Sequence, residues 1–98
     1  MSKSQALQDF QGIPGVGIRV AEDLWELGYH SSEDLRNQDP QEMYDKLCKL
    51  QKTKVDRCML YVFRCAVYFV NEQNHQPELL KWWRWSDHNL QKQGKMPS

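Results

Sequence analysis

A short glycine-rich segment, residues 12–17, is the part of the chain whose residue types and spacing best suit binding chemistry. Pro14 fixes its own φ angle, while Gly15 and Gly17 allow backbone conformations that other residues resist. Apolar residues then recur at helical spacing, at Ile18, Ala21, Leu24, Trp25 and Leu27. The segment therefore predicts a tight turn that opens into a helix. Because a helix start presents free N–H groups with partial positive charge, such a turn suits a phosphate.

The composition limits the classes of protein that fit. The 98 residues include 13 basic and 13 acidic side chains, so the formal net charge is zero. This counts against a strongly electrostatic nucleic-acid binder, although a local basic patch would suffice. Cys48, Cys58 and Cys65 have no metal-binding spacing and predict reduced, buried thiols in a cytoplasmic protein. No signal core or apolar run of about 20 residues is present, so no membrane association is expected.

Cap signals and apolar spacing predict about six helices, which must position the turn. A first short helix should end at Gly12, and a second should run from about residue 18 to 27. Gly28 should then adopt the left-handed conformation of a helix C-terminus. A short third helix is expected after Ser31. The Asp39-Pro40 pair is the strongest local signal, because an aspartate cap followed by proline is typical of a helix start.

The longest helix is predicted at about 54–71, and apolar residues cover roughly 200° or more of its circumference, against about 100° for a surface helix. We expect it to be the central helix of the fold, or to be partly buried in a dimer. Its polar stripe consists of Arg57, Tyr61, Arg64, Tyr68 and Asn71. The stripe could be a second phosphate-binding face, a solvated face, or a surface on which tryptophan rings stack against guanidinium groups.

A tryptophan-rich last helix is predicted at about 77–87, and it completes a single domain of residues 1–87. It contains a basic and aromatic cluster, Lys81, Trp82, Trp83, Arg84 and Trp85. The cluster could stack on exposed bases, or it could cover the long helix, in which case Trp83 is the ring most exposed to solvent. Residues 88–98 are expected to form a flexible tail.

The motif Ile13-Pro14-Gly15-Val16-Gly17-x-x-x-Ala21-x-x-Leu24 resembles a helix-hairpin-helix motif, here at about residues 7–28. The continuation is similar to the segment that follows such hairpins in DNA ligases, junction-helicase subunits and recombinases. It reads Leu27-Gly28-Tyr29-x-Ser31-x-Glu33-Asp34-Leu35, then Asp39-Pro40. This resemblance covers about residues 7–47. It implies an all-α, compact bundle built on one helix-hairpin-helix (SAM-like) motif.

The rest of the chain is similar to a narrower family. The matching stretches are Lys54-Val55-Asp56-Arg57-Cys58, Tyr61-Val62-Phe63-Arg64-Cys65-Ala66-Val67-Tyr68 and Pro77-Glu78-Leu79-Leu80-Lys81-Trp82-Trp83-x-Trp85. They resemble a small bacterial family whose labels are pathogenicity-locus protein and mitomycin-resistance protein. With these stretches, the resemblance covers nearly the whole chain. The labels imply DNA-related biology and assign no biochemical activity.

The helix-hairpin-helix resemblance implies which residues would bind DNA. Hairpin amides in such proteins bind phosphates without reading base sequence. The corresponding residues here are Gly15, Val16, Gly17, Ile18 and Arg19. The side chain of Arg19 could add a cationic contact. Related hairpins also hold a monovalent cation on backbone carbonyls, which correspond here to Gln11, Ile13 and Val16.

The same hairpin could instead only join two helices in a protein-interaction domain. The second helix carries Glu22, Asp23 and Glu26 against one basic residue, Arg19, and acidic groups repel DNA over ~10 Å at about 0.1 M salt. No constellation of a nucleophile, phosphate loop or acid–base pair suggests an enzyme or a cofactor. The sequence therefore predicts a non-enzymatic, sequence-independent DNA-binding module, weak alone and acting with a protein partner or as a homodimer. A protein-interaction domain that does not bind DNA is the alternative.

Overall fold

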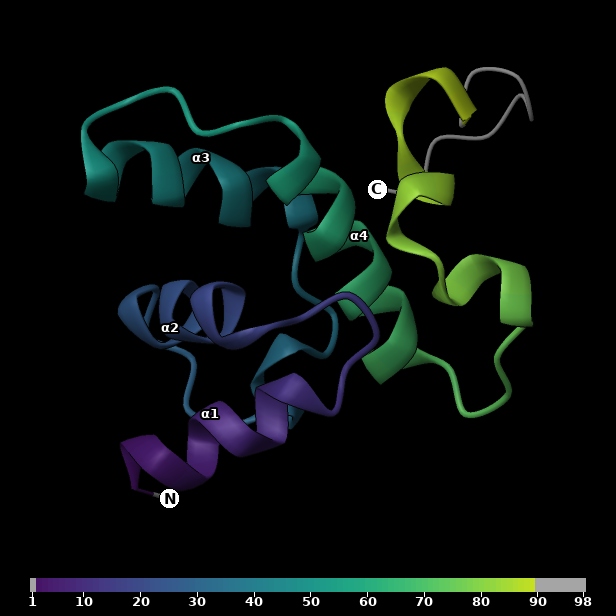
Figure 1. Ribbon diagram of the computed structural model, residues 1–98, viewed down its shortest axis with the longest axis horizontal. Helices are drawn as coiled ribbons and strands as arrows, with labels where there is room; N and C mark the ends of the chain where they lie inside the picture. The colour runs from purple at the N-terminus through teal and green to yellow at the C-terminus, as the bar shows by residue number, and fades with distance from the viewer. Residues whose placement is uncertain (1, 90–98) are drawn as a thin grey trace.

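The computed structural model describes residues 2–89, and all regular structure within this range is helical. Its elements are α1 (Lys3–Gln11), α2 (Ile18–Glu26), η1 (Ser32–Leu35), α3 (Pro40–Gln51), α4 (Cys58–Asn71), η2 (Pro77–Leu80) and η3 (Trp82–Trp85), where η denotes a 3₁₀-helix (Figure 1). The all-α class is therefore confirmed. The expected count of about six helices is not confirmed: residues 2–89 contain four complete α-helices, three short 3₁₀-helices and α-helical residues at 87–89. The Cα radius of gyration of 12.8 Å is that of a compact chain of this length.

Helix α4 lies between the first three α-helices and the C-terminal segment (Figure 1). It contacts α3, η1, η2 and η3, while α1 and α2 pack against each other. Its fully buried side chains are Leu60, Phe63, Cys65 and Ala66. The wide apolar arc that the sequence shows on this helix is thus used on several sides at once, which explains why so few of its residues face solvent.

The long helix begins at Cys58, not at Lys54 as the sequence predicts. Residues 54–56 are not helical, because polar groups of Val55 and Asp56 bond elsewhere. The Val55 carbonyl accepts a hydrogen bond from the Tyr44 hydroxyl, and the Val55 amide donates to the Sγ atom of Cys48 at 3.5 Å. The Asp56 carboxylate then accepts the Cys58 amide at 2.9 Å, which starts the helix there.

The predicted last helix at 77–87 is two 3₁₀-helices, η2 and η3, separated by an extended Lys81. Backbone carbonyls in this segment bind side chains and do not form a continuous helical ladder. The Leu79 carbonyl accepts the indole N–H of Trp85 at 2.8 Å, and the Trp85 carbonyl accepts from Arg64 at the same distance. The predicted third helix is likewise a single 3₁₀-helix, η1.

Several predicted helix ends are confirmed. Asp39 caps α3 by accepting the Gln41 amide at 2.9 Å, and Pro40 is the first helical residue. Gly28 follows α2 with a φ of +100°, as expected of a left-handed helix end. Of the predicted tail at 88–98, residues 90–98 lie outside the described residues. Within residues 2–89, no helix combines the length and apolar character needed to cross a membrane.

Candidate nucleic-acid interface

The glycine loop, residues 12–17, is fixed to the core by two apolar anchors. Ile13 and Val16 are buried, and the Val16 amide donates to the Ile13 carbonyl at 3.1 Å, which closes a tight turn around Pro14 and Gly15. The Ile13 amide in turn bonds to the Phe10 carbonyl of α1 at 3.0 Å. The loop therefore has a defined shape, set by the core beneath it and by the end of α1.

Of the three glycines in this loop, Gly15 and Gly17 differ in why a side chain is absent. Gly15 has a φ of +85°, and a Cβ atom added there would lie 3.1 Å from the Cδ1 atom of Trp82. Gly17 is extended, with φ −94° and ψ −171°, and an added Cβ would meet nothing within 4 Å. Gly15 is thus required by the fold, because Trp82 packs on it. Gly17 has no such requirement, and its missing side chain leaves the start of α2 open.

The N-terminus of α2 presents free donors. Gly17 occupies the cap position without any side-chain cap, and the first turn carries no acidic residue. Within residues 2–89, the amides of Gly15, Gly17, Ile18 and Arg19 donate no hydrogen bond, and all four residues are exposed. These amides and the positive end of the helix dipole can bind an anion.

Val16 differs from the other four residues of the predicted DNA-binding set. Its side chain is buried and its amide is already bonded to the Ile13 carbonyl. It shapes the loop and is not a free donor. That bond also uses one lone pair of a carbonyl in the predicted cation set of Gln11, Ile13 and Val16. Elsewhere among residues 2–89, no cluster of three or more His, Cys, Asp or Glu side chains could hold a metal ion.

The acidic residues of α2 all lie beyond its first turn. Asp23 accepts a hydrogen bond from the side chain of Gln51 at 3.2 Å, so it points toward the last turn of α3. Burial is the main cause that raises the pKa of Asp23. Glu22 and Glu26 are exposed. The free amides therefore have one cation, Arg19, in their own turn, and the negative charge begins one turn later.

The polar stripe of α4, the five residues Arg57, Tyr61, Arg64, Tyr68 and Asn71, is occupied by other parts of the chain. Arg64 is only 6% exposed, and its Nη1 atom donates to the Trp85 carbonyl at 2.8 Å and to Asp87 at 2.9 Å. Arg57 bonds to the other carboxylate oxygen of Asp87. These two arginines, Arg57 first, hold the pKa of Asp87 below its usual range.

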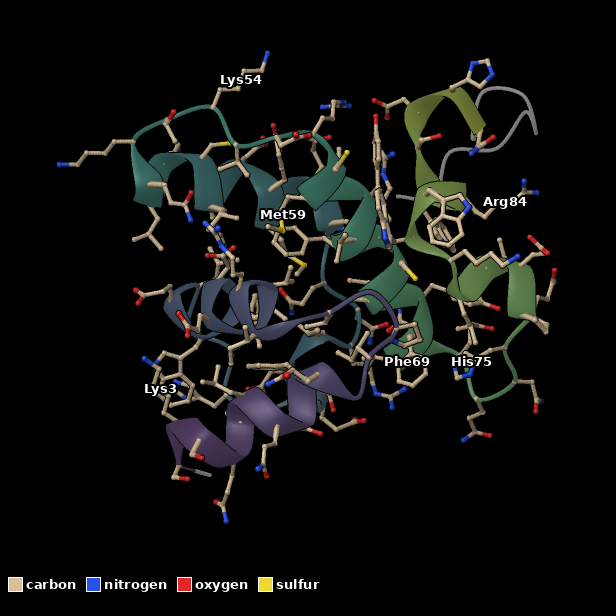
Figure 2. The ribbon with its side chains drawn as sticks, viewed as in Figure 1. Lys3, Lys54, Met59, Phe69, His75 and Arg84 are labelled. Atoms are coloured by element: carbon tan, nitrogen blue, oxygen red, sulfur yellow. The ribbon has the colours of Figure 1, made fainter. Side chains whose placement is uncertain are left out.

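The remaining stripe residues also bind within the molecule. The Tyr68 hydroxyl accepts the Gln76 amide at 2.9 Å, and the Asn71 side chain accepts the Asn37 amide at 2.8 Å. The Tyr61 hydroxyl lies 3.4 Å from the carboxylate of Asp87. Just beyond the stripe, His75 stacks on Phe69 with ring centroids 4.6 Å apart (Figure 2). Four of the five stripe residues therefore hold the C-terminal segment, residues 76–87, and Asn71 holds Asn37, which leaves the stripe unsuited to phosphate.

The tryptophan cluster also packs, for the most part, against the rest of the chain. Trp85 is buried beside Tyr68, and Trp82 covers Gly15. Lys81 and Arg84 both pair with Glu78, at 3.1 and 3.8 Å. Trp83 is 51% exposed, as the packing interpretation predicts. Trp85 is buried and Trp82 is half-buried, so Trp83 is the ring of this cluster most available to a base.

The cysteines agree only partly with the expectation of buried thiols. All three are free. Cys65 is fully buried, and burial raises its pKa to about 11. Cys48 is half-buried, but Cys58 is exposed. Cys58 was expected inside the long helix, and it is exposed because it is the first residue of α4.

A cavity of about 160 Å³ lies beside the C-terminal half of α4. Its walls are Pro40, Arg64, Val67, Tyr68, Asn71, Glu72 and Trp85. Three of its polar side chains, those of Arg64, Tyr68 and Asn71, are already hydrogen-bonded within the protein. The cavity is thus a gap beside the docked C-terminal segment, and it adds no group to the candidate interface.

No sequence-based prediction concerns the lysines near the end of α3. Four exposed lysines occur within nine residues, at Lys46, Lys49, Lys52 and Lys54. Among residues 2–89, none of them forms an ion pair. Their close spacing is visible in the sequence, although the net charge of zero does not reveal this local excess of positive charge.

The fold and this site define a class, a small all-helical protein with an open helix N-terminus and a C-terminal segment docked on its central helix. Within that class the chain belongs to the pathogenicity locus family, Cdd1, whose model matches residues 3–91. No curated protein and no solved structure matches the chain.

Proposed function

We propose that residues 3–26 act as a helix-hairpin-helix unit that binds DNA phosphates without reading base sequence and without catalysing a reaction. The observation that carries this proposal is the open start of α2, where the amides of Gly17, Ile18 and Arg19 have no acceptor within the described chain. A phosphate oxygen there would accept these N–H groups and interact favourably with the helix dipole. The Arg19 side chain would pair with the same phosphate or its neighbour.

Binding through this site alone is expected to be weak. One loop contacts few phosphates, and nonspecific affinity rises with the number of phosphates that the protein neutralises. Glu22 and Glu26, exposed on the following turns of α2, reduce the attraction further. The unit is therefore expected to act with a protein partner or as a second copy of itself on the same DNA.

A protein-interaction domain is the second candidate, and the exposure of Ile18 favours it. This side chain is 50% exposed and stands between Gly17 and Arg19, in the middle of the free donors. A partner could pack an apolar residue on Ile18 and place a carboxylate over the amides. That arrangement would use the same donors without DNA.

The test is fluorescence anisotropy on duplex, single-stranded and junction DNA over a series of salt concentrations. The informative variants are Arg19→Ala and Gly17→Asp. Aspartate fits the extended backbone and open space at position 17, and it would cap α2 by accepting its first amides. Gly17→Asp should therefore keep or raise the melting temperature while weakening DNA binding about tenfold, the equivalent of one charged hydrogen bond of roughly 1.5 kcal/mol. Gly17→Ala is the matched control, because it leaves the amides free.

The outcomes separate the two candidates. DNA affinity that falls with salt, and that falls further in Arg19→Ala and Gly17→Asp but not in Gly17→Ala, supports phosphate binding at the loop. If the parent and both variants bind DNA equally well, the α2 N-terminus is not the contact. If the parent shows no binding at about 50 mM salt, where electrostatic attraction is strong, the protein-interaction candidate is favoured.

A further inference from the structure

The lysine patch, defined as Lys46, Lys49, Lys52 and Lys54, concentrates positive charge in a chain with no net charge. Residues 46–57 contain five basic side chains and one acidic side chain, Asp56. The carboxylate of Asp56 accepts the Cys58 amide and starts α4. The patch therefore keeps its positive charge without an internal partner among residues 2–89.

Folding accounts for only part of this patch. Lys49 lies in the last turn of α3, where a cation interacts favourably with the helix dipole. Lys52 has a φ of +55°, a left-handed conformation in which glycine is the less costly residue. Lys54 follows in the connecting loop and makes no hydrogen bond that the structure shows among residues 2–89. A lysine at position 52 therefore needs another explanation.

The end of α3 contacts the middle of α2, beyond its open first turn. Gln51, in the last turn of α3, donates a hydrogen bond to Asp23 of α2 at 3.2 Å. Arg19 precedes Asp23 by four residues, so it lies on the same face of α2, about 6 Å away along the helix axis. In the view of Figures 1 and 2, α3 lies between α2 and the loop that carries Lys54. Arg19 and Gln51 therefore both lie near Asp23, and the patch extends from there along the end of α3.

We propose that the lysine patch is a second phosphate-contacting surface, which acts together with the α2 N-terminus so that the chain binds duplex DNA across several phosphates. This inference rests on the proposed function of the glycine loop. Duplex DNA carries one charge per about 1.7 Å along its axis, and flexible lysines neutralise such charge without reading sequence. The patch supplies the phosphate contacts that one loop lacks.

The first experiment measures the salt dependence of duplex binding for Lys49→Gln/Lys52→Gln/Lys54→Gln. Each phosphate contact contributes about −0.9 to the slope of log affinity against log salt. Losing three contacts should therefore make the slope shallower by about 2 to 3. The matched control is Lys3→Gln/Arg36→Gln/Lys81→Gln, which removes three exposed charges from outside the patch. The control should leave the slope near that of the parent.

A second variant separates binding from folding. Lys52→Gly places glycine at a left-handed position, so the melting temperature should rise. The same change removes one charge, so the slope of log affinity against log salt should become shallower by about 0.9. A more stable protein that binds DNA less well supports a direct contact by Lys52. A more stable protein with an unchanged slope contradicts it.

The outcomes for the two sites are distinguishable. If the triple lysine variant binds like its control while Arg19→Ala and Gly17→Asp lose affinity, the patch inference is wrong and the loop proposal stands. If the lysine variant loses affinity and the loop variants do not, the loop proposal fails and the patch is the DNA-binding surface. If the parent does not bind duplex DNA at all, both are overturned.

Discussion

The start of α2 and the polar stripe of α4 both look suited to phosphate, but the structure leaves only one of them free. On the stripe, Arg64 and Arg57 bind Asp87 and the C-terminal backbone. At the start of α2, the amides of Gly17 and Ile18 have no partner within the described chain. A row of arginines and tyrosines can therefore hold two parts of one domain together. We call this contact, of Arg57 and Arg64 with Asp87 and the Trp85 carbonyl, the joint. Free backbone N–H groups, by contrast, cannot be recognised from the amino-acid composition.

The largest expected effect comes from breaking the joint at Arg64. Arg64→Ala removes two hydrogen bonds and leaves the Trp85 carbonyl without its partner, so we expect a loss of about 3 kcal/mol in the free energy of unfolding. Urea unfolding followed by tryptophan fluorescence measures this loss. Arg57→Ala, at a half-exposed site, should cost less than about 1 kcal/mol. Equal losses in the two variants would contradict the central role of Arg64.

The next effect tests the tie between the glycine loop and the tryptophan-rich segment. Gly15→Ala must adopt a φ of +85° and place its Cβ 3.1 Å from the Trp82 ring. We expect it to destabilise the protein by about 1–2 kcal/mol. Gly17→Ala, with an ordinary extended backbone and open space, should change stability by less than about 0.5 kcal/mol. Thermal unfolding of the pair checks this, and two equal changes would show that Trp82 does not rest on the loop.

The smallest effect is a pH dependence of the joint. The folded-state pKa of Asp87 lies below its unfolded value, chiefly because of the bond from Arg57, with a further contribution from Arg64. Its stabilisation is therefore present above about pH 4 and is lost as the pH falls through the folded pKa. Asp87→Asn should cost about 1 kcal/mol at neutral pH.

Urea unfolding of the parent and Asp87→Asn, at about pH 7 and about pH 3, measures this dependence. The difference between the two proteins should shrink as the pH falls. Because the other carboxylates titrate in both proteins, the comparison isolates Asp87. A difference that stays constant with pH would mean that the carboxylate charge makes no contribution to the joint.

The local features of the fold could be predicted because they depend on neighbouring residues. Asp39 and Pro40 mark the start of α3 by capping chemistry alone, and Gly28 marks the end of α2 because few residues adopt its conformation. The helical class followed from apolar spacing. The glycine loop could also be located, since Pro14 and Gly15 restrict the backbone in a recognisable way.

The start of α4 and the form of the C-terminal segment could not be predicted in this way. The Val55 backbone bonds to Tyr44 and Cys48 of another helix, which delays α4 to Cys58. The Trp85 ring bonds to the Leu79 carbonyl, which favours two 3₁₀-helices over one α-helix. These bonds join residues that pair only once the helices have packed.

The sequence by itself determined the helical class, the position of the glycine loop and the donors that it offers, because these follow from local backbone chemistry. Only the tertiary structure decided which cations are available. It paired Arg57 and Arg64 with Asp87, and it left Arg19 and Lys52 free of ion pairs within residues 2–89. The physical reason is that a charge is available to a partner only when folding brings no opposite charge to it.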